Sequence, residues 1–335
     1  MNILITGGSG YIGSCTALKI IQKYKAKCII IDKKESSNLE KLTLSYPQNI
    51  VFHKIDLCNY SALSVLFEEI TREYKIDVVI HFAAYAIVAE SEKYPHTYLQ
   101  NNINSTVNLL DLMVKHNINN LIFSSSASVY GEAKYVPIDE DHPLEPQSFY
   151  ALSKKVCEEI IQRYSKKGLN FINLRYFNPA GAIGYLGEEH NPETHLIPLL
   201  IKSLIEGGIF RIFGNDFPTK DGTCIRDFIH IEDLVDSHIL SMEKLLNEEI
   251  ENEVFNVGIN QGHSVLEVVN KAIEIFKNKI NPRFKYIFES RREGDVPILV
   301  AKAEKIKRKL GFKPKYNLED ILQSAWNYQI HKISL

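Results

Sequence analysis

The segment that most constrains the fold lies at the start of the chain, where "ILITGGSGYIGS" (residues 3–14) joins an apolar run to a helical pattern. Its glycines at 7, 10 and 13 permit a tight turn and let a phosphate approach the amides of a helix N-terminus. Asp32 ends the second apolar run at nearly the spacing expected of a ribose-binding acid. The arrangement predicts a dinucleotide-binding unit, and the carboxylate favours NAD over NADP because it would repel a 2′-phosphate.

Short, nearly continuous apolar runs alternate with helical patterns through the first half of the chain. Such runs are typical of parallel strands whose two faces are both covered. The predicted strands are 2–6, 28–32, 50–54, 78–84, 120–126 and 171–177, and the predicted helices are Tyr60–Tyr74, Pro95–His116 and one that opens near Tyr150. This order predicts an α/β protein with a Rossmann-type, doubly wound parallel sheet.

The second half has a different texture, which begins with a loop rich in Gly, Pro and Asn after about Asn178. The predicted elements here are helices near Leu196–Glu206, 233–246, 264–277 and 317–330 and strands near 210–213 and 225–231. A further apolar run, "EVFNVG" (253–258), is interpreted as a strand that returns to the first sheet. We therefore predict an NAD-binding domain over 1–178, completed by part of 225–260, and a smaller C-terminal substrate-binding α/β domain over 179–335.

Charge and cysteine usage exclude several classes of protein. The formal net charge is −2 and the basic residues are scattered, which argues against a nucleic-acid partner. The sequence shows neither a continuous apolar span nor a signal-peptide pattern, so we expect no membrane contact and a cytoplasmic location. The cysteines are five, far apart and never in a C-x-x-C pair, so we expect reduced, mostly buried thiols, no disulfide and no metal site. They are Cys15, Cys28, Cys58, Cys157 and Cys224.

The stretch "FYALSK" (149–154) places Tyr150 one helical turn before Lys154. Such a pair is common by chance, and an isolated tyrosine, with a pKa of about 10, is a poor base at neutral pH. A lysine ammonium and the positive ring of NAD⁺ would both lower that pKa. Ser126 follows the fifth predicted strand and can share a substrate hydroxyl with the tyrosine. Together with the glycine turn and Asp32, the set predicts hydride transfer assisted by Tyr150.

Other strand ends converge on the same place, because ligands of open α/β sheets bind at the carboxyl ends of the strands. Asp56 and Leu57 follow the third predicted strand, and Phe82 and Ala83 come at the end of the fourth. Ser124 lies near the end of the fifth. Each is unremarkable singly, but their common position predicts the cofactor crevice.

With these residues in view, the sequence resembles the extended short-chain dehydrogenase/reductase family, and within it the UDP-glucose 4-epimerases. The resemblance covers essentially the whole chain and rests on "TGGSGYIGS", "FSSSASVYG", "YALSK", "LRYFNPAGA", "RREGD" and, most specifically, "GNDFPTKDGTCIRDFIHI". It implies an NAD-dependent isomerase of galactose metabolism that oxidises a UDP-hexose at C4, lets the 4-keto sugar rotate and returns hydride to the other face. It also implies a homodimer formed through helices 95–116 and 150–165.

The resemblance further implies roles for individual residues. The catalytic residues are Tyr150, Ser126 and Lys154. The cofactor contacts are Gly7, Gly10, Tyr11, Ile12, Gly13, Asp32, Asp56, Leu57, Phe82, Ala83, Asn101, Ser124, Tyr150, Lys154 and Phe177. The substrate contacts are Ser126, Tyr150, Asn178, Leu196, Arg226, Arg292, Asp295 and Leu299.

Several of these positions have another interpretation or depart from the family pattern. Either arginine of the substrate set could instead form an ion pair with Asp227 or Asp295. Ala86 stands where some relatives have a lysine near the cofactor, and His195 where others have an asparagine. Leu299 stands where a large tyrosine excludes 2-acetamido sugars in the family and a small residue admits them, so an intermediate pocket is expected; it could equally be a core residue.

Two other functions compete with epimerisation. Sugar-nucleotide dehydratases of the family carry Asp and Glu directly after the strand-five Ser or Thr, whereas this chain has Ala127 and Ser128, which argues against dehydration. A related epimerase or decarboxylase stays open. A non-catalytic dinucleotide sensor would have no need for Ser126, Tyr150 and Lys154, and it ranks last.

Overall fold

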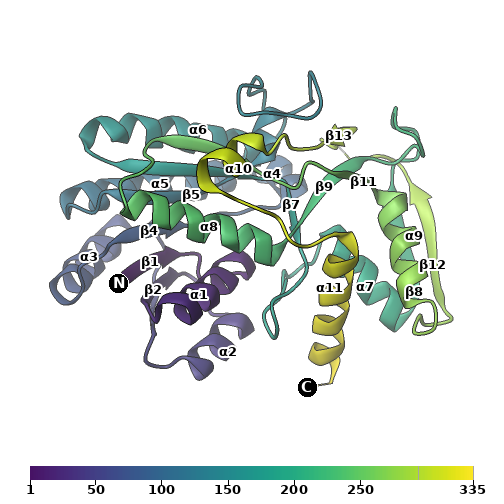
Figure 1. Cartoon of the computed structure of the whole chain (residues 1–335), viewed down its shortest axis with the longest axis horizontal. Coiled ribbons are helices and arrows are strands. Elements are labelled where there is room, and N and C mark those ends of the chain that lie inside the picture. The colour runs from purple at the N-terminus through teal and green to yellow at the C-terminus, as the bar shows by residue number, and fades with distance from the viewer. Residues whose placement is uncertain (293, 335) are drawn as a thin grey trace.

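A seven-stranded parallel sheet forms the centre of the computed structural model, which describes residues 1–292 and 294–334 (Figure 1). The strand order is β10-β6-β5-β4-β1-β2-β3, which confirms the predicted doubly wound α/β class. The strands are β1 (Asn2–Thr6), β2 (Lys27–Asp32), β3 (Ile50–Lys54), β4 (Val78–His81), β5 (Asn120–Ser126), β6 (Asn170–Tyr176) and β10 (Glu253–Val257). The chain order reverses beside β1, and in such sheets the reversal opens a crevice at the carboxyl ends of the strands.

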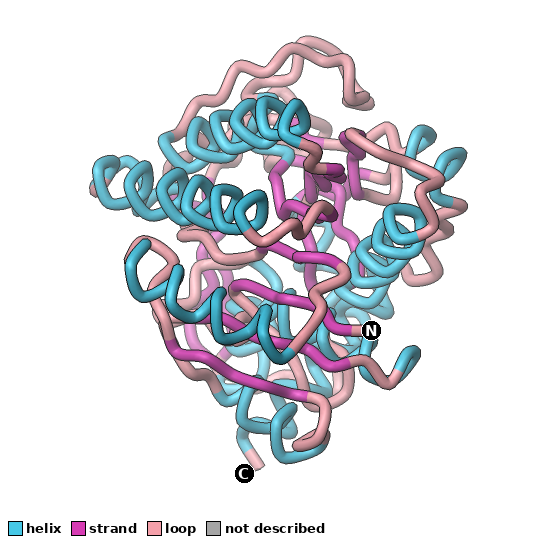
Figure 2. The backbone as a smooth tube through the Cα atoms, turned by 90° about the vertical axis from the view of Figure 1, so that its left-hand side faces the viewer, coloured by secondary structure: helices cyan, strands magenta, loops and turns pink. Residues whose placement is uncertain are grey.

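Helices cover both faces of this sheet, as the end-on view in Figure 2 shows. One face packs against α3 (Tyr60–Glu73), α5 (Pro95–Lys115) and α6 (Phe149–Tyr164). The other packs against α1 (Tyr11–Tyr24), α2 (Ser37–Ser45), α8 (Ile231–Leu246) and α10 (Glu304–Leu310). Burial on both sides explains why the strands read as continuous apolar runs in the sequence.

A smaller body lies on the right of Figure 1 and has its own apolar core. Its helices are α7 (Leu196–Glu206), α9 (Val265–Phe276) and α11 (Leu318–Ile333). Its strands form a small mixed sheet of β7 (Asn178–Ala180), β9 (Ile225–His230), β11 (Gly262–Ser264) and β13 (Ile298–Leu299), and a parallel pair of β8 (Gly208–Phe213) and β12 (Phe284–Glu289).

Two predictions about the chain path can be compared directly with the structure. The strand predicted at 253–258 is confirmed, since β10 pairs in parallel with β6 at the edge of the large sheet. The strand predicted at 78–84 is wrong in length, because β4 ends at His81 and the next three residues form a loop.

All five cysteines are free and four are buried. Among the described residues, no helix combines the length and apolar character needed to cross a bilayer.

Candidate active site

One elongated pocket of about 930 Å³ runs from the carboxyl ends of the parallel strands to the smaller body. Every residue that the sequence predicted for the site lines it, which brings together segments from residue 7 to residue 299. These residues are Gly7, Gly10, Tyr11, Ile12, Gly13, Asp32, Asp56, Leu57, Phe82, Ala83, Asn101, Ser124, Ser126, Tyr150, Lys154, Phe177, Asn178, Leu196, Arg226, Arg292, Asp295 and Leu299. Their individual roles stay predictions.

The glycine turn between β1 and α1 forms one wall of the pocket. The Gly10 amide donates to the Gly7 carbonyl at 3.1 Å and closes the turn. A Cβ on Gly7, whose φ is +71°, would lie 2.5 Å from the Ala83 amide nitrogen, and one on Gly13 would lie 2.5 Å from the Gly7 carbonyl oxygen. Only glycine therefore lets the turn, the first turn of α1 and the loop after β4 pack together.

Asp32 lies at the end of β2, beside this turn. Its carboxylate accepts hydrogen bonds from the Ser9 and Lys34 amides, both at 3.2 Å. Burial raises the pKa of this carboxyl, and the two amides oppose the shift. The neighbouring Lys33 was missed by the sequence reasoning; its Nζ contacts the Tyr85 hydroxyl at 2.6 Å and the Asn101 Oδ1 at 2.9 Å. The pocket here thus combines a fixed acceptor with a nearby ammonium.

Tyr150 and Lys154 project from the first turns of α6, opposite Ser126 at the end of β5. Lys154 is buried, and its Nζ donates to the Ser124 carbonyl at 2.6 Å. Ser126 Oγ is 2.8 Å from Ser128 Oγ. Helix α6 begins here because the Ser148 hydroxyl caps it by accepting from the Ala151 amide at 3.1 Å. The capped helix start fixes the phenol and the ammonium on one face toward the pocket.

The electrostatics of this trio correct one expectation. We expected Lys154 and the positive ring of NAD⁺ to lower the pKa of Tyr150. In the protein alone burial raises that pKa, and the Ser126 side chain, not Lys154, opposes the shift; the effect of NAD⁺ stays a prediction. Burial also lowers the pKa of Lys154 to about 8, against the raising effects of Cys157 and Glu158. The physical reason is that desolvation disfavours the charged forms of both groups.

The far end of the pocket carries the two arginines. Arg226 donates from Nη1 to the carbonyls of Ile225 and Val296, at 2.9 and 2.8 Å, and its Nη2 lies 3.6 Å from Asp295 Oδ1. The guanidinium of Arg292 lies over the Phe213 ring, 3.9 Å from its centroid. The alternative ion pair of Arg226 with Asp295 is therefore present, while Arg226 still faces the pocket.

Asp227 does not pair with either arginine. Its buried carboxylate accepts the amides of Ile259, Asn260 and Ala301 at 2.9, 3.0 and 3.1 Å. Burial raises its pKa to about 6 despite these three bonds. The residue ties β9 to segments that follow β10 and β13, which makes it structural.

Two more predicted substrate residues are placed by short elements. Asn178 opens β7 and donates from Nδ2 to the Asp227 carbonyl at 3.1 Å. Leu299 lies on β13 opposite Arg226 of β9 and is 9% exposed. It belongs to a small apolar cluster with Phe177 and also lines the pocket, so both interpretations of Leu299 describe part of its environment.

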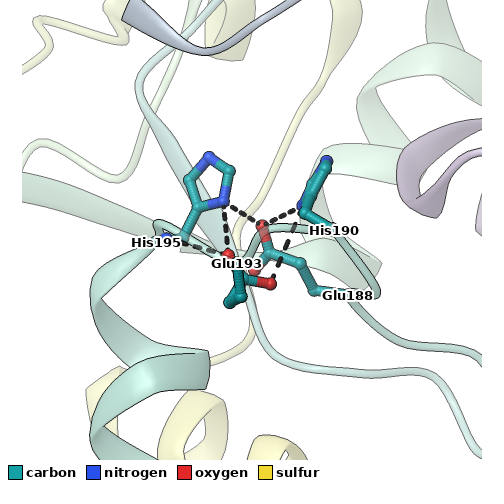
Figure 3. Close-up of side chains that lie close together, drawn as sticks. All are labelled: Glu188, His190, Glu193 and His195. Atoms are coloured by element: carbon teal, nitrogen blue, oxygen red, sulfur yellow. Dashed lines mark hydrogen bonds and ion pairs between the residues drawn. The ribbon is translucent and has the colours of Figure 1, made fainter. Parts of the chain in front are cut away.

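A cluster of two glutamates and two histidines at the pocket edge was missed by the sequence reasoning, which looked for metal ligands only among the cysteines. Figure 3 shows Glu188, His190, Glu193 and His195 turned toward one another. Burial would raise the pKa of Glu188, but hydrogen bonds from the two histidines lower it to about 2. Burial would lower the pKa of His195, but the two glutamates raise it to about 10. The signal was the spacing Glu-x-His-x-x-Glu-x-His within 188–195.

Comparison with known proteins finds similarity over almost the whole chain. The family model described as GDP-mannose 4,6-dehydratase matches residues 4–325. A UDP-glucose 4-epimerase of Lactobacillus helveticus is 39% identical over 333 residues, which are 98% of this chain and 97% of that protein.

Two solved structures extend the similarity to three dimensions. The UDP-glucose 4-epimerase of Bifidobacterium longum, in complex with NAD⁺ and UDP, is 32% identical, with a TM-score of 0.90 and 99% of each chain covered. The UDP-Glc/GlcNAc 4-epimerase of Campylobacter jejuni is 35% identical, with a TM-score of 0.81 over 98% of this chain and 99% of that one.

Proposed function

Because the chain belongs to the extended short-chain dehydrogenase/reductase family and is a sugar-nucleotide 4-epimerase of the UDP-glucose 4-epimerase type, we propose that it interconverts UDP-glucose and UDP-galactose with NAD as cofactor. The observation that carries the proposal is the convergence of Ser126, Tyr150 and Lys154 on a pocket that the glycine turn and Asp32 also line.

The residues at the sheet end of the pocket fit a dinucleotide. The first turn of α1 presents the amides of neutral residues, and these suit a pyrophosphate. Gly7 and Gly13 keep this approach free of side chains. Asp32 offers a carboxylate to a ribose hydroxyl and repels a 2′-phosphate, which favours NAD over NADP. When bound, NAD⁺ supplies a hydride acceptor that can return the hydride to either face of the sugar.

The chain's own residues handle the proton. Tyr150 Oη takes the proton of the 4-hydroxyl as the C4–H bond breaks and gives it back when the alcohol re-forms. Ser126 Oγ holds the same hydroxyl or carbonyl oxygen in place. Lys154, whose Nζ is held by the Ser124 carbonyl, would donate to the ribose of a bound NAD. Burial raises the pKa of Tyr150, so the free protein keeps this group as a phenol. The positive ring of bound NAD⁺ would lower this pKa and favour the phenolate, which is the form that can accept the proton.

The other end of the pocket suits a UDP moiety. Arg226 and Arg292 offer permanently charged, planar donors to two phosphates. The Bifidobacterium longum protein, which carries UDP together with NAD⁺, supports this assignment.

Dehydration is the weaker alternative, although the matching family model takes its name from a dehydratase. Elimination of water needs a further acid and base near the reacting carbons. Ala127 and Ser128 occupy the two positions after Ser126, and the Ser128 hydroxyl forms a hydrogen bond with the Ser126 hydroxyl. The chain therefore lacks the carboxylates that the dehydratases place there.

The test is to incubate the purified protein with UDP-galactose without added cofactor and to separate the products by anion-exchange chromatography. We expect UDP-glucose at equilibrium, and NAD as the nucleotide released when the protein is denatured. A Tyr150→Phe preparation serves as the control for contaminating activity. Recovery of unchanged UDP-galactose, or of a 4-keto-6-deoxy sugar nucleotide, would refute the proposal.

A further inference from the structure

The edge of the pocket holds a group of side chains that the epimerase chemistry does not use. Glu188, His190, Glu193 and His195 each present one oxygen or nitrogen atom, and these four atoms all lie within 4.8 Å of one another (Figure 3). We propose that the four side chains bind one divalent transition-metal ion, with Zn²⁺ as the best match, and that the ion fastens the loop 187–195 at the pocket edge.

The distances within the cluster fit a tetrahedral ion. His195 Nδ1 is 2.8 Å from a Glu188 oxygen and 2.9 Å from a Glu193 oxygen. His190 Nδ1 is 3.2 Å from the same Glu188 oxygen and 3.9 Å from the other oxygen of Glu193. Bonds of about 2.0–2.1 Å from a central Zn²⁺ would set such atoms about 3.3–3.4 Å apart. The four distances lie on both sides of that value, and the two that involve Glu193 end on different oxygens of its carboxylate. A tetrahedral site would therefore need side-chain shifts, including a rotation of the Glu193 carboxylate.

The chemistry of the donors selects the kind of metal. Two imidazole nitrogens and two carboxylate oxygens suit Zn²⁺ and neighbouring transition metals, whereas Mg²⁺ and Ca²⁺ prefer oxygen ligands alone. Two carboxylates would also neutralise the charge of a divalent ion. Four protein ligands leave a tetrahedral ion without an open position, which is typical of a structural site and not of a catalytic one.

The loop is held so that these side chains meet. Glu193 Oε1 accepts the amides of Thr194 and His195, both at 2.8 Å, which orients its carboxylate in the way that outer partners orient metal ligands. On the other side, the Gly187 carbonyl accepts from Asn38 Nδ2 at 2.8 Å, and Glu189 accepts from the Tyr328 hydroxyl at 2.5 Å.

These anchors flank Glu188, whose side chain is only 7% exposed, so its carboxylate is committed to the cluster. The competing explanation is an ion-paired network, in which each histidine donates an Nδ1 proton to the carboxylates. The two explanations differ in one measurable respect: only the first predicts stoichiometric uptake of a metal.

The experiment uses the full chain, stripped with a chelator, and ZnCl₂ as the probe in the absence of any sugar nucleotide. We expect one Zn²⁺ per chain by titration calorimetry and elemental analysis, no comparable uptake of Mg²⁺, and a higher Tm with Zn²⁺. Loading with Co²⁺ should give the intense visible absorption of a tetrahedral site. Because these readouts do not involve turnover, they stand apart from the test of the epimerase activity.

The decisive variant is His190→Gln combined with Glu193→Gln, which changes two of the four ligands and leaves the buried Glu188 in place. Affinity for Zn²⁺ should fall by at least about 100-fold, since even loss of an outer partner costs 10–100-fold. His331→Gln, at an exposed histidine of α11, is the matched control and should bind as wild type does. Circular dichroism checks that the variants fold. Equal Zn²⁺ uptake by the wild type and the double variant, or none by either, overturns the proposal in favour of the ion-paired network.

Discussion

At the scale of single side chains, the sequence predicted where Tyr150 lies but not how its surroundings shift its pKa. The spacing to Lys154 and the distance from Ser126 located the pair correctly at the pocket, because helix periodicity is a local property. The pKa shift could not be predicted in the same way, since it depends on how much protein surrounds the two groups. The Glu188–His195 cluster was missed for a different reason: its spacing is local and present in the sequence, but only the cysteines had been considered as metal ligands. The contacts of its loop with α2 and α11, by contrast, could not be predicted from local patterns.

The first residue-scale prediction is that Tyr150→Phe lowers kcat by about 100-fold or more, the usual contribution of general acid–base catalysis. The change removes one hydroxyl that faces the pocket and no core volume, so the Tm should stay near that of wild type. Steady-state turnover of UDP-galactose and a thermal melt measure the two quantities. Tyr135→Phe, which removes an exposed hydroxyl bonded to Asp139, is the control and should leave kcat unchanged. A Tyr150→Phe enzyme with wild-type kcat would contradict the assignment.

The second residue-scale prediction concerns Leu299 and substrate size. Leu299→Ser should raise the ratio of kcat/KM for UDP-N-acetylgalactosamine over UDP-galactose by about tenfold or more. The reason is that a size difference of even one methylene in a pocket discriminates between two substrates by about 1–3 kcal/mol. Wild type should prefer UDP-galactose and turn over the 2-acetamido sugar weakly. Leu299→Met keeps the volume and is the control. If the serine variant keeps the wild-type ratio, Leu299 acts only through its apolar cluster with Phe177.

At the scale of elements, the sequence predicted the large sheet better than the small ones. Strands buried on both faces leave continuous apolar runs, and β10 was predicted although it pairs with β6 from about 80 residues away along the chain. Strand β12 was not predicted, because it lies at the surface with most of its side chains exposed, so its pattern lacks the signal of burial. Strand β13 has two residues, which is too short for any periodicity.

The element-scale prediction concerns Asp227, which ties β9 to its neighbours. In the unfolded chain this carboxyl loses its proton near pH 4, whereas in the folded protein its pKa is about 6. Between these values the folded state binds more protons, so the free energy of unfolding falls as pH rises from 4 to 6, by about 2 kcal/mol for this group. Asp227→Asn keeps an oxygen acceptor and removes the titration.

Urea unfolding at pH 4, 5 and 6 measures this effect. The fall in the free energy of unfolding should be smaller in Asp227→Asn than in wild type. Asp233, another buried carboxyl whose pKa is raised to about 6, contributes in the same direction to both proteins and cancels in the comparison. Equal slopes in the two proteins would mean that Asp227 is ionised throughout this range.

At the scale of the whole molecule, the two helices that were predicted to form a dimer interface lie side by side on one face of the large sheet (Figure 1). Helix α6 turns Leu152 outward with 37% of its surface exposed, and the half-buried Val156 follows one turn later. A second copy packed on α5 and α6 would bury these side chains in a four-helix arrangement. Because α6 also carries Tyr150 and Lys154, such an interface would brace the helix that positions the catalytic pair.

We therefore predict a homodimer, with a mass by light scattering of twice the 38.3 kDa chain. Leu152→Glu should shift the protein to monomer at micromolar concentration, because an uncompensated carboxylate is costly in an apolar interface. The control is Ile330→Glu, at an apolar residue of α11 with 41% exposure that lies away from α5 and α6. It should stay dimeric. A Leu152→Glu protein with the mass of a dimer, or a wild-type protein with the mass of a monomer, would contradict the predicted interface and with it the bracing of α6.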